Sequence, residues 1–370
     1  MSNPLLELKK FDQSVWLDNI SRGILNNGEL KKLVENDGIS GVTSNPSIFQ
    51  KAIGKGKDYD EQLTSLLGEN PELSAGPLFE NIAVKDIQDG TDVLHGVYEK
   101  TNGNDGYVSL EVSPELAYDT NGTIEEARRL FKSVNRKNLM IKIPATTEGI
   151  PAIRQMISEG VNINVTLIFS QSVYEQVVEA FISGLEERVK QGKEINSIAS
   201  VASFFISRID SAVDSELDKK GNSDLKGRVA IANAKLVYEK CDEIFNSERF
   251  KSLKEKGAKR QRLLWASTST KTPAYPDVLY VEELIGANTV NTMPPATIDA
   301  YKDHGKPAER ITLNLEEAEA QMKKLKDIGI DFQEITEKLT ADGVVLFANS
   351  FKELLEEIDR KKKDILAQTV

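Results

Sequence analysis

Residues 139–144 read LMIKIP, and this short run is the most informative guide to the fold. Successive residues of a β-strand point to opposite faces of the sheet. Leu139, Ile141 and Ile143 therefore share one apolar face, and Lys142 lies on the other. A lysine in the middle of an apolar strand lies either at a sheet edge, where it discourages aggregation, or in the interior with a compensating partner. The apolar neighbours and the central place of this strand in the chain favour the interior.

Short apolar segments alternate with longer amphipathic stretches along the chain, which is typical of a mostly parallel sheet covered by helices. Two such stretches are GELKKLVEND (28–37) and SVYEQVVEAFISGLEERVKQ (172–191), and the segment 46–106 has room for more than one helix. From about residue 314 the pattern predicts further helices. Eight strands are predicted, at residues 14–19, 39–45, 107–112, 139–145, 162–169, 198–206, 262–268 and 289–293.

Other strands repeat the division into an apolar and a polar face. Asp18 and Glu111 lie on the polar face of the first and third strands. In the fifth strand, Asn164 and Thr166 share the polar face, and Leu167 belongs to the apolar one. A flat sheet between two layers of helices is apolar on both faces. A closed barrel has helices only outside, and its inner face can hold a site at the C-terminal mouth, so the pattern favours a barrel.

The predicted fold class is therefore α/β, a (β/α)8 TIM barrel with additional helices in the N-terminal region and at the C-terminus. We expect residues 1–370 to form a single barrel domain, with the helices from about residue 314 packing on the barrel. No linker, low-complexity tract or short repeat interrupts the pattern, which supports one elaborated domain.

Composition excludes several classes of protein. The 370-residue chain carries a formal net charge of −11, which disfavours nucleic acid and anionic membranes as partners. No apolar run approaches the roughly 20 residues that span a bilayer, and the N-terminus lacks the pattern of a signal peptide. We therefore expect a cytoplasmic protein, either a monomer or a homodimer. The single cysteine, Cys241, has the spacing of a helix core residue, so we expect a packed thiol. His95 and His304 lack partners at metal-ligand spacing, so no metal is expected.

Lys142 is the candidate nucleophile. Burial and nearby cations favour the neutral form of a lysine amine, which attacks carbonyl carbons. Formation and dehydration of a carbinolamine, followed by carbon–carbon cleavage, all require proton transfers. Asp18 and Glu111 lie on the same inner face and are the candidate acids and bases. The structural alternative for each carboxylate is a buried ion pair with Lys142, which does not exclude catalysis.

Further polar residues suit the binding of a phosphorylated sugar. Asn45, Asn164 and Thr166 can bond sugar hydroxyls or a water, although each taken singly is more typical of a polar turn or sheet residue. In VASFFISRID, Ser203 ends the polar face of the sixth strand and Arg208 begins the next helix. An arginine at a helix start suits a phosphate, and a surface arginine is the equal alternative.

Two basic stretches are set aside. GKGKDYD (54–60) lacks the spacing of a phosphate-binding P-loop. KSLKEKGAKRQR (251–262) precedes the seventh strand, so we expect it to be solvated, at the end of the barrel opposite the mouth.

Two long motifs resemble those of the transaldolase family. DGISGVTSNPSIFQKAI (37–53) contains a V-T-[TS]-N-P-S core, and MIKIPATTEGIPAIRQMISEGVNINVTLIFS (140–170) is similar to the family's active-site lysine segment. The resemblance extends over nearly the whole chain and is greatest to the longer bacterial branch. It implies cofactor-free transfer of a dihydroxyacetone unit from sedoheptulose 7-phosphate to glyceraldehyde 3-phosphate. The products would be erythrose 4-phosphate and fructose 6-phosphate, in the non-oxidative pentose phosphate pathway. The shorter matching stretches are SLEVSPELAYDT, FFISRID, LLWASTSTK, NTMPPATIDAY and DGVVLFANSFKELLEEI.

The resemblance also implies a role for each matching residue. Lys142 would form the Schiff base, and Asp18 would take the proton during carbon–carbon cleavage. Glu111 would work with Thr166 through a water during Schiff-base formation. Asn45 and Asn164 would hold the dihydroxyacetone hydroxyls, with Thr43 lining the site. Ser203 and Arg208 would bind phosphate, and Ser267 would also line the substrate.

One motif departs from the family pattern. Many members have S-F-R after the seventh strand, where this chain has STSTK (267–271), so Lys271 is the candidate for a second phosphate-binding cation. An aldolase acting on fructose 6-phosphate is the nearest alternative, because the same lysine chemistry serves it. The sequence is also compatible with a pyridoxal-phosphate enzyme or with a non-catalytic barrel.

Overall fold

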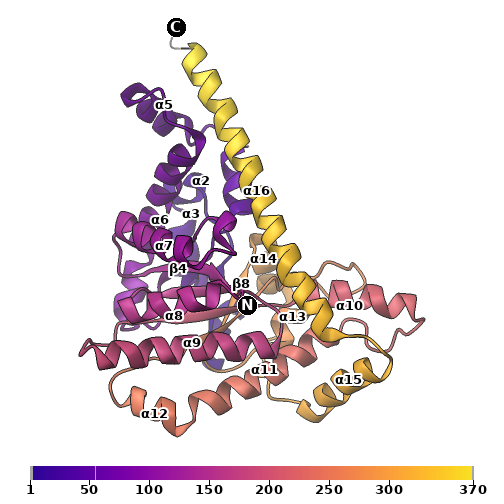
Figure 1. Cartoon of the computed structure of the whole chain (residues 1–370). Coiled ribbons are helices and arrows are strands. Elements are labelled where there is room, and N and C mark those ends of the chain that lie inside the picture. The colour runs from indigo at the N-terminus through magenta and orange to yellow at the C-terminus, as the bar shows by residue number, and fades with distance from the viewer. Residues whose placement is uncertain (1–2, 55, 369–370) are drawn as a thin grey trace.

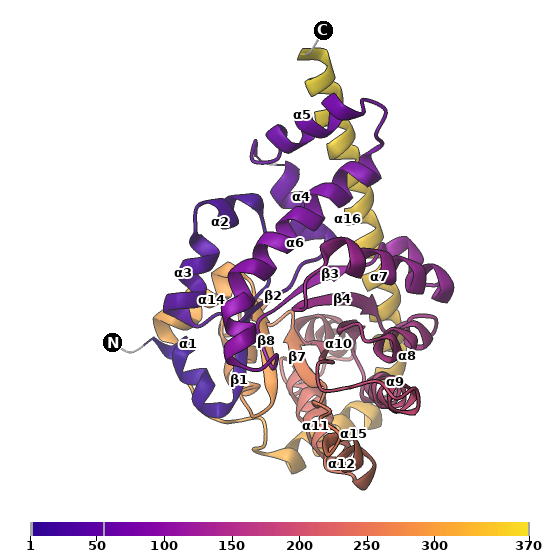
Figure 2. The ribbon, with the colours of Figure 1, turned by 90° about the vertical axis from the view of Figure 1, so that its left-hand side faces the viewer.

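The centre of the protein is a closed barrel of eight parallel strands, seen in a computed structural model that describes residues 3–54 and 56–368 (Figure 1; Figure 2). Each strand pairs with the next, and the last pairs with the first, so the sheet has no edge. The TIM-barrel prediction is confirmed, and all eight strands lie where the sequence predicts them. They are β1 (Gln13–Leu17), β2 (Gly41–Val42), β3 (Tyr107–Glu111), β4 (Leu139–Pro144), β5 (Ile163–Ile168), β6 (Ser200–Phe205), β7 (Arg262–Ala266) and β8 (Thr289–Met293).

Helices surround the barrel, and the helices predicted over 28–37 and 172–191 are confirmed as α3 (Glu29–Asp37) and α9 (Gln171–Lys190). The described residues of the segment 46–106 form three helices, as the pattern allowed. In chain order the helices are α1 (Pro4–Glu7), η1 (Leu8–Phe11), α2 (Arg22–Asn26), α3 (Glu29–Asp37), α4 (Pro46–Gly54), α5 (Asp60–Glu69), α6 (Ala75–Lys100), η2 (Pro114–Leu116), α7 (Thr120–Val134), α8 (Gly149–Glu159), α9 (Gln171–Lys190), α10 (Ser207–Lys219), α11 (Val229–Phe245), α12 (Glu248–Lys254), α13 (Leu279–Glu283), α14 (Pro295–His304), α15 (Leu315–Asp327) and α16 (Phe332–Gln368).

β2 is much shorter than the predicted strand over 39–45. Its first residue, Gly41, lies against the indole of Trp16, and a Cβ at position 41 would come within 2.3 Å of that ring. Only glycine allows this approach between neighbouring strands. The chain then turns directly into α4, where the side-chain oxygen of Asn45 accepts the backbone N–H of Ile48 at 3.0 Å. The early turn places the residues after β2 at the mouth of the barrel.

The predicted alternation of β5 stops before Leu167. This residue has a φ of 59°, and the pairing of β5 with β6 shifts register between Val165 and Ile168. Leu167 therefore does not continue the apolar face that packs under the covering helices, and that prediction is wrong. Its side chain instead faces Gly343 of α16, where an added Cβ would lie 2.8 Å from a Leu167 methyl. A bulge at a barrel rim re-aims side chains in this way.

α16 crosses the molecule on the side of the C-terminal mouth and then extends beyond the body of the barrel (Figure 1). It contacts β5, α10, α4 and α6, while α15 packs against α11. The far end of α16 lies beside α5, where Lys361 Nζ donates to Asp60 Oδ1 at 2.7 Å. The two C-terminal helices predicted from the sequence thus pack on different sides, and only α16 reaches the mouth.

The opposite end of the barrel is closed by a polar cluster. The guanidinium of Arg262 donates to Ser14 Oγ and to the carbonyl of Asn104, both at 2.8 Å, and lies 3.5 Å from a carboxylate oxygen of Asp105. Trp16 Nε1 also donates to Asp105, at 2.7 Å. The prediction that the basic run 251–262 is solvated is therefore wrong for its last two residues: Gln261 is buried, and Arg262 enters β7 and points inward.

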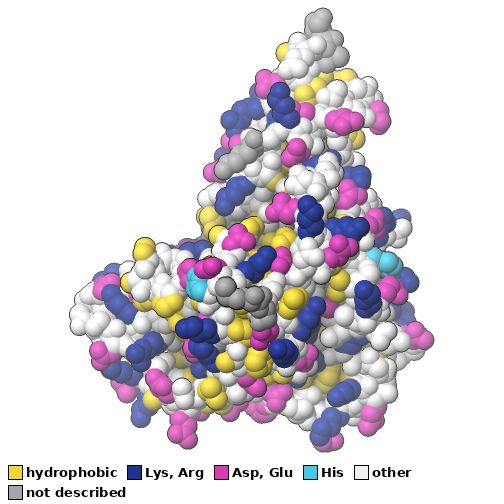
Figure 3. All heavy atoms as spheres, turned by 180° about the vertical axis from the view of Figure 1, so that it is seen from behind, with side chains coloured by type: hydrophobic (Ala, Val, Ile, Leu, Met, Phe, Trp, Pro, Cys, Tyr) yellow, Lys and Arg dark blue, Asp and Glu magenta, His cyan; other side chains and the backbone are white. Residues whose placement is uncertain are grey.

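The surface agrees with the acidic, mixed composition. Basic and acidic side chains are interspersed over the face turned away in Figure 1 (Figure 3). Among the helices of the described residues, none is long and apolar enough to cross a membrane. Cys241 is buried, as its helical spacing predicts. Within residues 3–54 and 56–368, no group of three or more His, Cys, Asp or Glu side chains has the arrangement of a metal site.

Candidate active site

A cavity of about 300 Å³ lies at the C-terminal ends of the strands, where Phe347 of α16 forms part of its wall. Eight of the predicted site residues line it, namely Asp18, Thr43, Asn45, Lys142, Ser203, Arg208, Ser267 and Lys271. Two of the remaining three, Glu111 and Asn164, are the register partners of Lys142 on β3 and β5, and Thr166 follows on β5. The alternation of side chains along each strand therefore places Lys142, Glu111, Asn164 and Thr166 on the inner face of the barrel.

Lys142 is buried, with 4% of its surface exposed, and it cannot be an edge lysine because the barrel has no edge. Its Nζ lies 3.4 Å from Glu111 Oε2 and donates to the carbonyl of Ser44 at 3.2 Å. The carboxylate compensates the buried charge of Lys142, as expected for a structural ion pair. The same contact gives the amine a proton-transfer partner.

A chain of hydrogen bonds fixes the floor beside Lys142. Asn164 donates through Nδ2 to Ser109 Oγ at 3.0 Å, and its Oδ1 accepts from Ser203 Oγ at 2.7 Å. Thr166 Oγ1 is buried and has no hydrogen-bond partner within the described part of the chain. Polar groups held in one orientation are suited to bind the hydroxyls of a ligand.

Burial favours the neutral form of both carboxyls near Lys142. Desolvation raises the pKa of Asp18 above its ordinary value, against a hydrogen bond from Thr43 Oγ1 at 2.7 Å and the nearby charge of Lys142. Desolvation likewise raises the pKa of Glu111, although the charge of Lys142 opposes the shift. Carboxyls whose pKa lies closer to neutrality exchange protons more readily with a reacting group.

We expect Asp18→Asn to stabilise the protein at neutral pH. Because the folded-state pKa of Asp18 is raised, the fold binds a proton more readily than the unfolded chain does, so the ionised carboxylate lowers stability at higher pH. An asparagine removes that cost and can still accept the hydrogen bond of Thr43. Thermal unfolding should show a midpoint higher by about 2–4 °C at neutral pH, and the gain should vanish below the ordinary aspartate pKa of about 4. Asp327→Asn, on the exposed end of α15, is the control; a lower midpoint for Asp18→Asn would contradict the prediction.

The other end of the cavity is cationic. The guanidinium of Arg208 lies 5.1 Å from the ring of Phe205 and 5.9 Å from that of Phe347, and desolvation lowers its pKa. Lys271 reaches the cavity from the exposed loop after β7, and partial burial and the charge of Arg208 lower its pKa. These charges form a local positive site in an acidic protein, which suits an anionic ligand.

Three residues of the site are not singled out by the strand pattern, although each lies in a stretch that resembles the family. Ser44 contributes only its backbone carbonyl to Lys142, and Lys51 reaches the cavity from α4. Phe347 comes from α16, and its ring lies 5.7 Å from Lys142 Nζ. Strand parity does not identify them because one acts through its backbone and the other two lie on helices.

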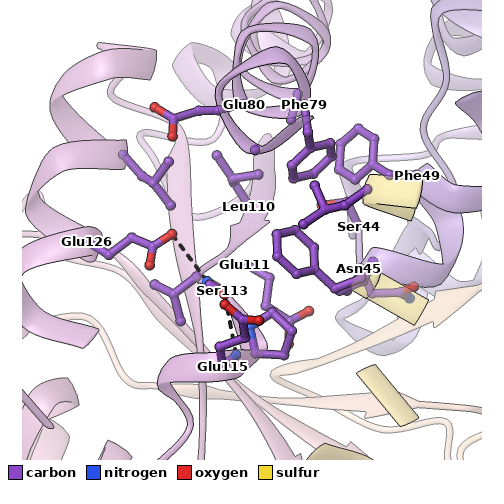
Figure 4. Close-up of a pocket in the computed structure, with 18 of the residues that line it drawn as sticks. Ser44, Asn45, Phe49, Phe79, Glu80, Leu110, Glu111, Ser113, Glu115 and Glu126 are labelled. Carbon is purple, nitrogen blue, oxygen red and sulfur yellow. Dashed lines mark hydrogen bonds between the residues drawn. The ribbon is translucent and has the colours of Figure 1, made fainter. Parts of the chain in front are cut away.

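A second cavity, of about 320 Å³, shares Asn45 with the first and is also lined by Glu111 (Figure 4). Three phenylalanines line it, with Phe79 in edge-to-face contact with Phe49 at 5.4 Å and with Phe351 at 5.6 Å, and the glutamates Glu80, Glu115 and Glu126 line it too. Glu111 thus lies between this mixed cavity and the amine of Lys142. Its burial there gives a physical reason for the raised pKa of this carboxyl.

A buried lysine beside a carboxyl, at the C-terminal mouth of a (β/α)8 barrel and facing a cationic pocket, defines an enzyme class. It is the class of barrel enzymes whose lysine can condense with a phosphorylated carbonyl substrate. Comparison with known proteins agrees with this class and narrows it. Residues 15–358 match the model of the Transaldolase/Fructose-6-phosphate aldolase family. The chain belongs to this family of enzymes.

Curated relatives resemble the chain over nearly its full length. A protein of Trichodesmium erythraeum named transaldolase is 47% identical, with 99% of each chain covered. A protein of Nostoc sp. named transaldolase 2 is 48% identical, with 98% of each covered. A transaldolase of Thermobifida fusca is 45% identical over 97% of this chain and 98% of its own. Relatives of this name are transferases, in agreement with the enzyme class expected from the sequence.

Proposed function

We propose that this chain is a transaldolase that moves a dihydroxyacetone unit from sedoheptulose 7-phosphate to glyceraldehyde 3-phosphate, with Lys142 as the nucleophile. The observation that carries the proposal is the buried contact between Lys142 and Glu111 at the barrel mouth. Family membership and the names of the relatives support the same reaction. The products are erythrose 4-phosphate and fructose 6-phosphate.

In the first stage the amine of Lys142 adds to the ketose carbonyl, and loss of water gives a protonated Schiff base. Glu111 is 3.4 Å from the amine and supplies the proton transfers of this step, through a water that Thr166 helps to hold. Asp18 then takes the proton of the C4 hydroxyl as the C3–C4 bond breaks. The electron pair of that bond moves into the Schiff base, so the aldose leaves and an enamine stays on the lysine.

In the second stage the enamine carbon attacks the acceptor aldehyde, and Asp18 returns its proton to the new hydroxyl. Hydrolysis of the Schiff base then releases the product ketose and restores Lys142. Asn45 and Asn164 hold the dihydroxyacetone hydroxyls, with Thr43 lining the wall. The phosphate binds at the cationic end of the cavity, to Arg208, Ser267 and Lys271, together with Ser203.

Transfer, rather than release, of the three-carbon unit requires that water does not protonate the enamine. The ring of Phe347 lies over Lys142 and also beside Arg208, so α16 shields the cavity between the reacting amine and the phosphate end. We propose that this cover favours transfer over the aldolase side reaction.

Reduction with borohydride in the presence of fructose 6-phosphate tests the assignment. Peptide mass mapping should find a three-carbon adduct on Lys142, and turnover should depend on an acceptor aldehyde. Turnover without any adduct on Lys142 would overturn the nucleophile, and acceptor-independent release of dihydroxyacetone at the full rate would identify an aldolase instead. Absorbance of a pyridoxal group in the purified protein would identify a pyridoxal-phosphate enzyme instead.

The same proposal covers the setting of the enzyme. We propose that it works in the cytoplasm, in the non-oxidative pentose phosphate pathway, as a monomer or homodimer built from one barrel domain. Sugar phosphates are its substrates, and the reaction uses no cofactor. Sedimentation of the purified protein measures the oligomeric state.

A further inference from the structure

The loop that carries Lys271 has no regular secondary structure to hold it in place. It runs from residue 267 to 278, between β7 and α13, with neither helix nor strand. Lys271 and Arg208 line the same cavity, and burial together with the charge of Arg208 lowers the pKa of Lys271, so the two cations repel each other. This repulsion tends to move the loop away from α10 unless other bonds oppose it. The contacts of the loop therefore bear on the geometry of the phosphate end.

Tyr275 fastens this loop to α10. Its hydroxyl donates to Asp214 Oδ2 at 2.6 Å, and Asp214 Oδ1 accepts the backbone N–H of Gly227 at 3.2 Å. Gly227 has a φ of +68°, and a Cβ there would lie 2.8 Å from the tyrosine ring, so the ring is seated closely on the backbone. One carboxylate thus joins α10, the connection between α10 and α11, and the Lys271 loop.

Tyr280 makes a similar arrangement one helical turn away. Its hydroxyl donates to Asp210 Oδ2 at 2.8 Å, and Asp210 Oδ1 accepts the backbone N–H of Ala230 at 2.8 Å. The two links are similar but not identical: Tyr275 ties the loop itself to α10, and Tyr280 ties α13, the helix that follows the loop, to α10 and to the start of α11. Hydrogen bonds to carboxylates are stronger than those between neutral groups, so each link can resist the repulsion between the cations.

We propose that Tyr275 and Tyr280 are positioning residues for the phosphate of the substrate. Their hydrogen bonds to the two aspartates of α10 hold Lys271 at a fixed place relative to Arg208, so that both cations engage one phosphate. Holding the loop before the substrate arrives removes the ordering cost from binding. The inference rests on the proposed function, because it assumes that the substrate phosphate lies between these two cations.

The test uses Tyr275→Phe, Tyr280→Phe and the double variant, which keep each ring and remove only the hydroxyl. The assays are run at about pH 8.5, where Asp210 is ionised, because burial raises the pKa of Asp210 to about 7. The double variant should raise KM for fructose 6-phosphate by about five- to tenfold and change kcat by less than about twofold. Inorganic phosphate should become a weaker competitive inhibitor by a similar factor.

Two measurements separate positioning from general loosening of the fold. Trapping of dihydroxyacetone on Lys142 with borohydride needs no phosphate contact, so its rate should equal that of the wild type. Tyr238→Phe is the matched control, because Tyr238 also donates from its hydroxyl, to Ala287 O at 3.1 Å, but lies outside the loop. This variant should leave KM and phosphate inhibition unchanged.

An unchanged KM and unchanged phosphate inhibition in the double variant would overturn the inference. So would an equal loss of dihydroxyacetone trapping, because the effect would then not concern the phosphate. Failure of the wild type to form any adduct with fructose 6-phosphate overturns the proposed function itself, and that result is visible before any variant is compared.

Discussion

Replacing Lys142 by methionine is expected to lower the turnover rate by about 10⁴-fold or more, because on the proposed mechanism this amine holds the three-carbon unit between the two half-reactions. Methionine has a similar length and is apolar, so it suits a buried strand position. The raised pKa of Glu111 allows that carboxyl to become neutral when the lysine charge is removed. We therefore expect the variant to fold. Steady-state assays and borohydride trapping measure the loss, and no three-carbon adduct should form.

Lys235→Met provides the matched control for this result. Lys235 is also buried, with 6% of its surface exposed, and its Nζ donates to Leu313 O at 3.0 Å, away from the cavity of Lys142. The same substitution there should leave kcat and the borohydride adduct unchanged, whatever it does to stability. Residual activity above about 1% in Lys142→Met would mean that another group carries the reaction.

The largest loss of stability is expected from Arg262→Met, at the closed end of the barrel. The substitution removes the guanidinium from Asp105 and leaves a buried carboxylate without its cation. Breaking a buried pair by removing one partner costs about 3–5 kcal/mol of unfolding free energy. Urea unfolding, followed by circular dichroism, should show a correspondingly lower midpoint with an unchanged slope.

The double variant Arg262→Met, Asp105→Asn tests the reason for that loss. The neutral amide still offers an oxygen to Trp16 Nε1, so the double variant should regain much of the lost stability. Activity per folded molecule should stay near the wild-type value in both variants, because the cluster lies at the end of the barrel away from Lys142. A double variant no more stable than the single one would show that the arginine acts through packing or its other hydrogen bonds.

One local rule predicts the barrel and the strand residues of its mouth, whereas Thr43, Ser267 and Lys271 are predicted only from the family resemblance. In a strand, the choice of face has a period of two, so the position of Lys142 within LMIKIP also places its partners on neighbouring strands. The rule fails where geometry is not local. Leu167 adopts a positive φ at the rim, and the residues of its own strand do not predict the bulge.

Some features depend on tertiary contacts that no periodic pattern contains. Arg262 belongs to a basic run that looks solvated, and only closure of the barrel brings Asp105 beside it. Phe347 has the spacing of an ordinary core residue of a helix, yet α16 carries it to Lys142. The second cavity also depends on tertiary contacts, because the phenylalanines that line it come from separate helices. These features follow from how elements meet rather than from what each element is.

Because α16 follows β8 in the chain, the order of synthesis determines when the mouth of the barrel is covered. The ribosome makes all eight strands, and Lys142 with them, before it makes the helix that covers the mouth. On the proposed mechanism, a barrel that closes early has its amine open to bulk water, and an enamine formed there is protonated and lost. Productive transfer therefore begins only when α16 docks. On this mechanism, the docking of α16 both completes the active site and protects the enamine from protonation by water.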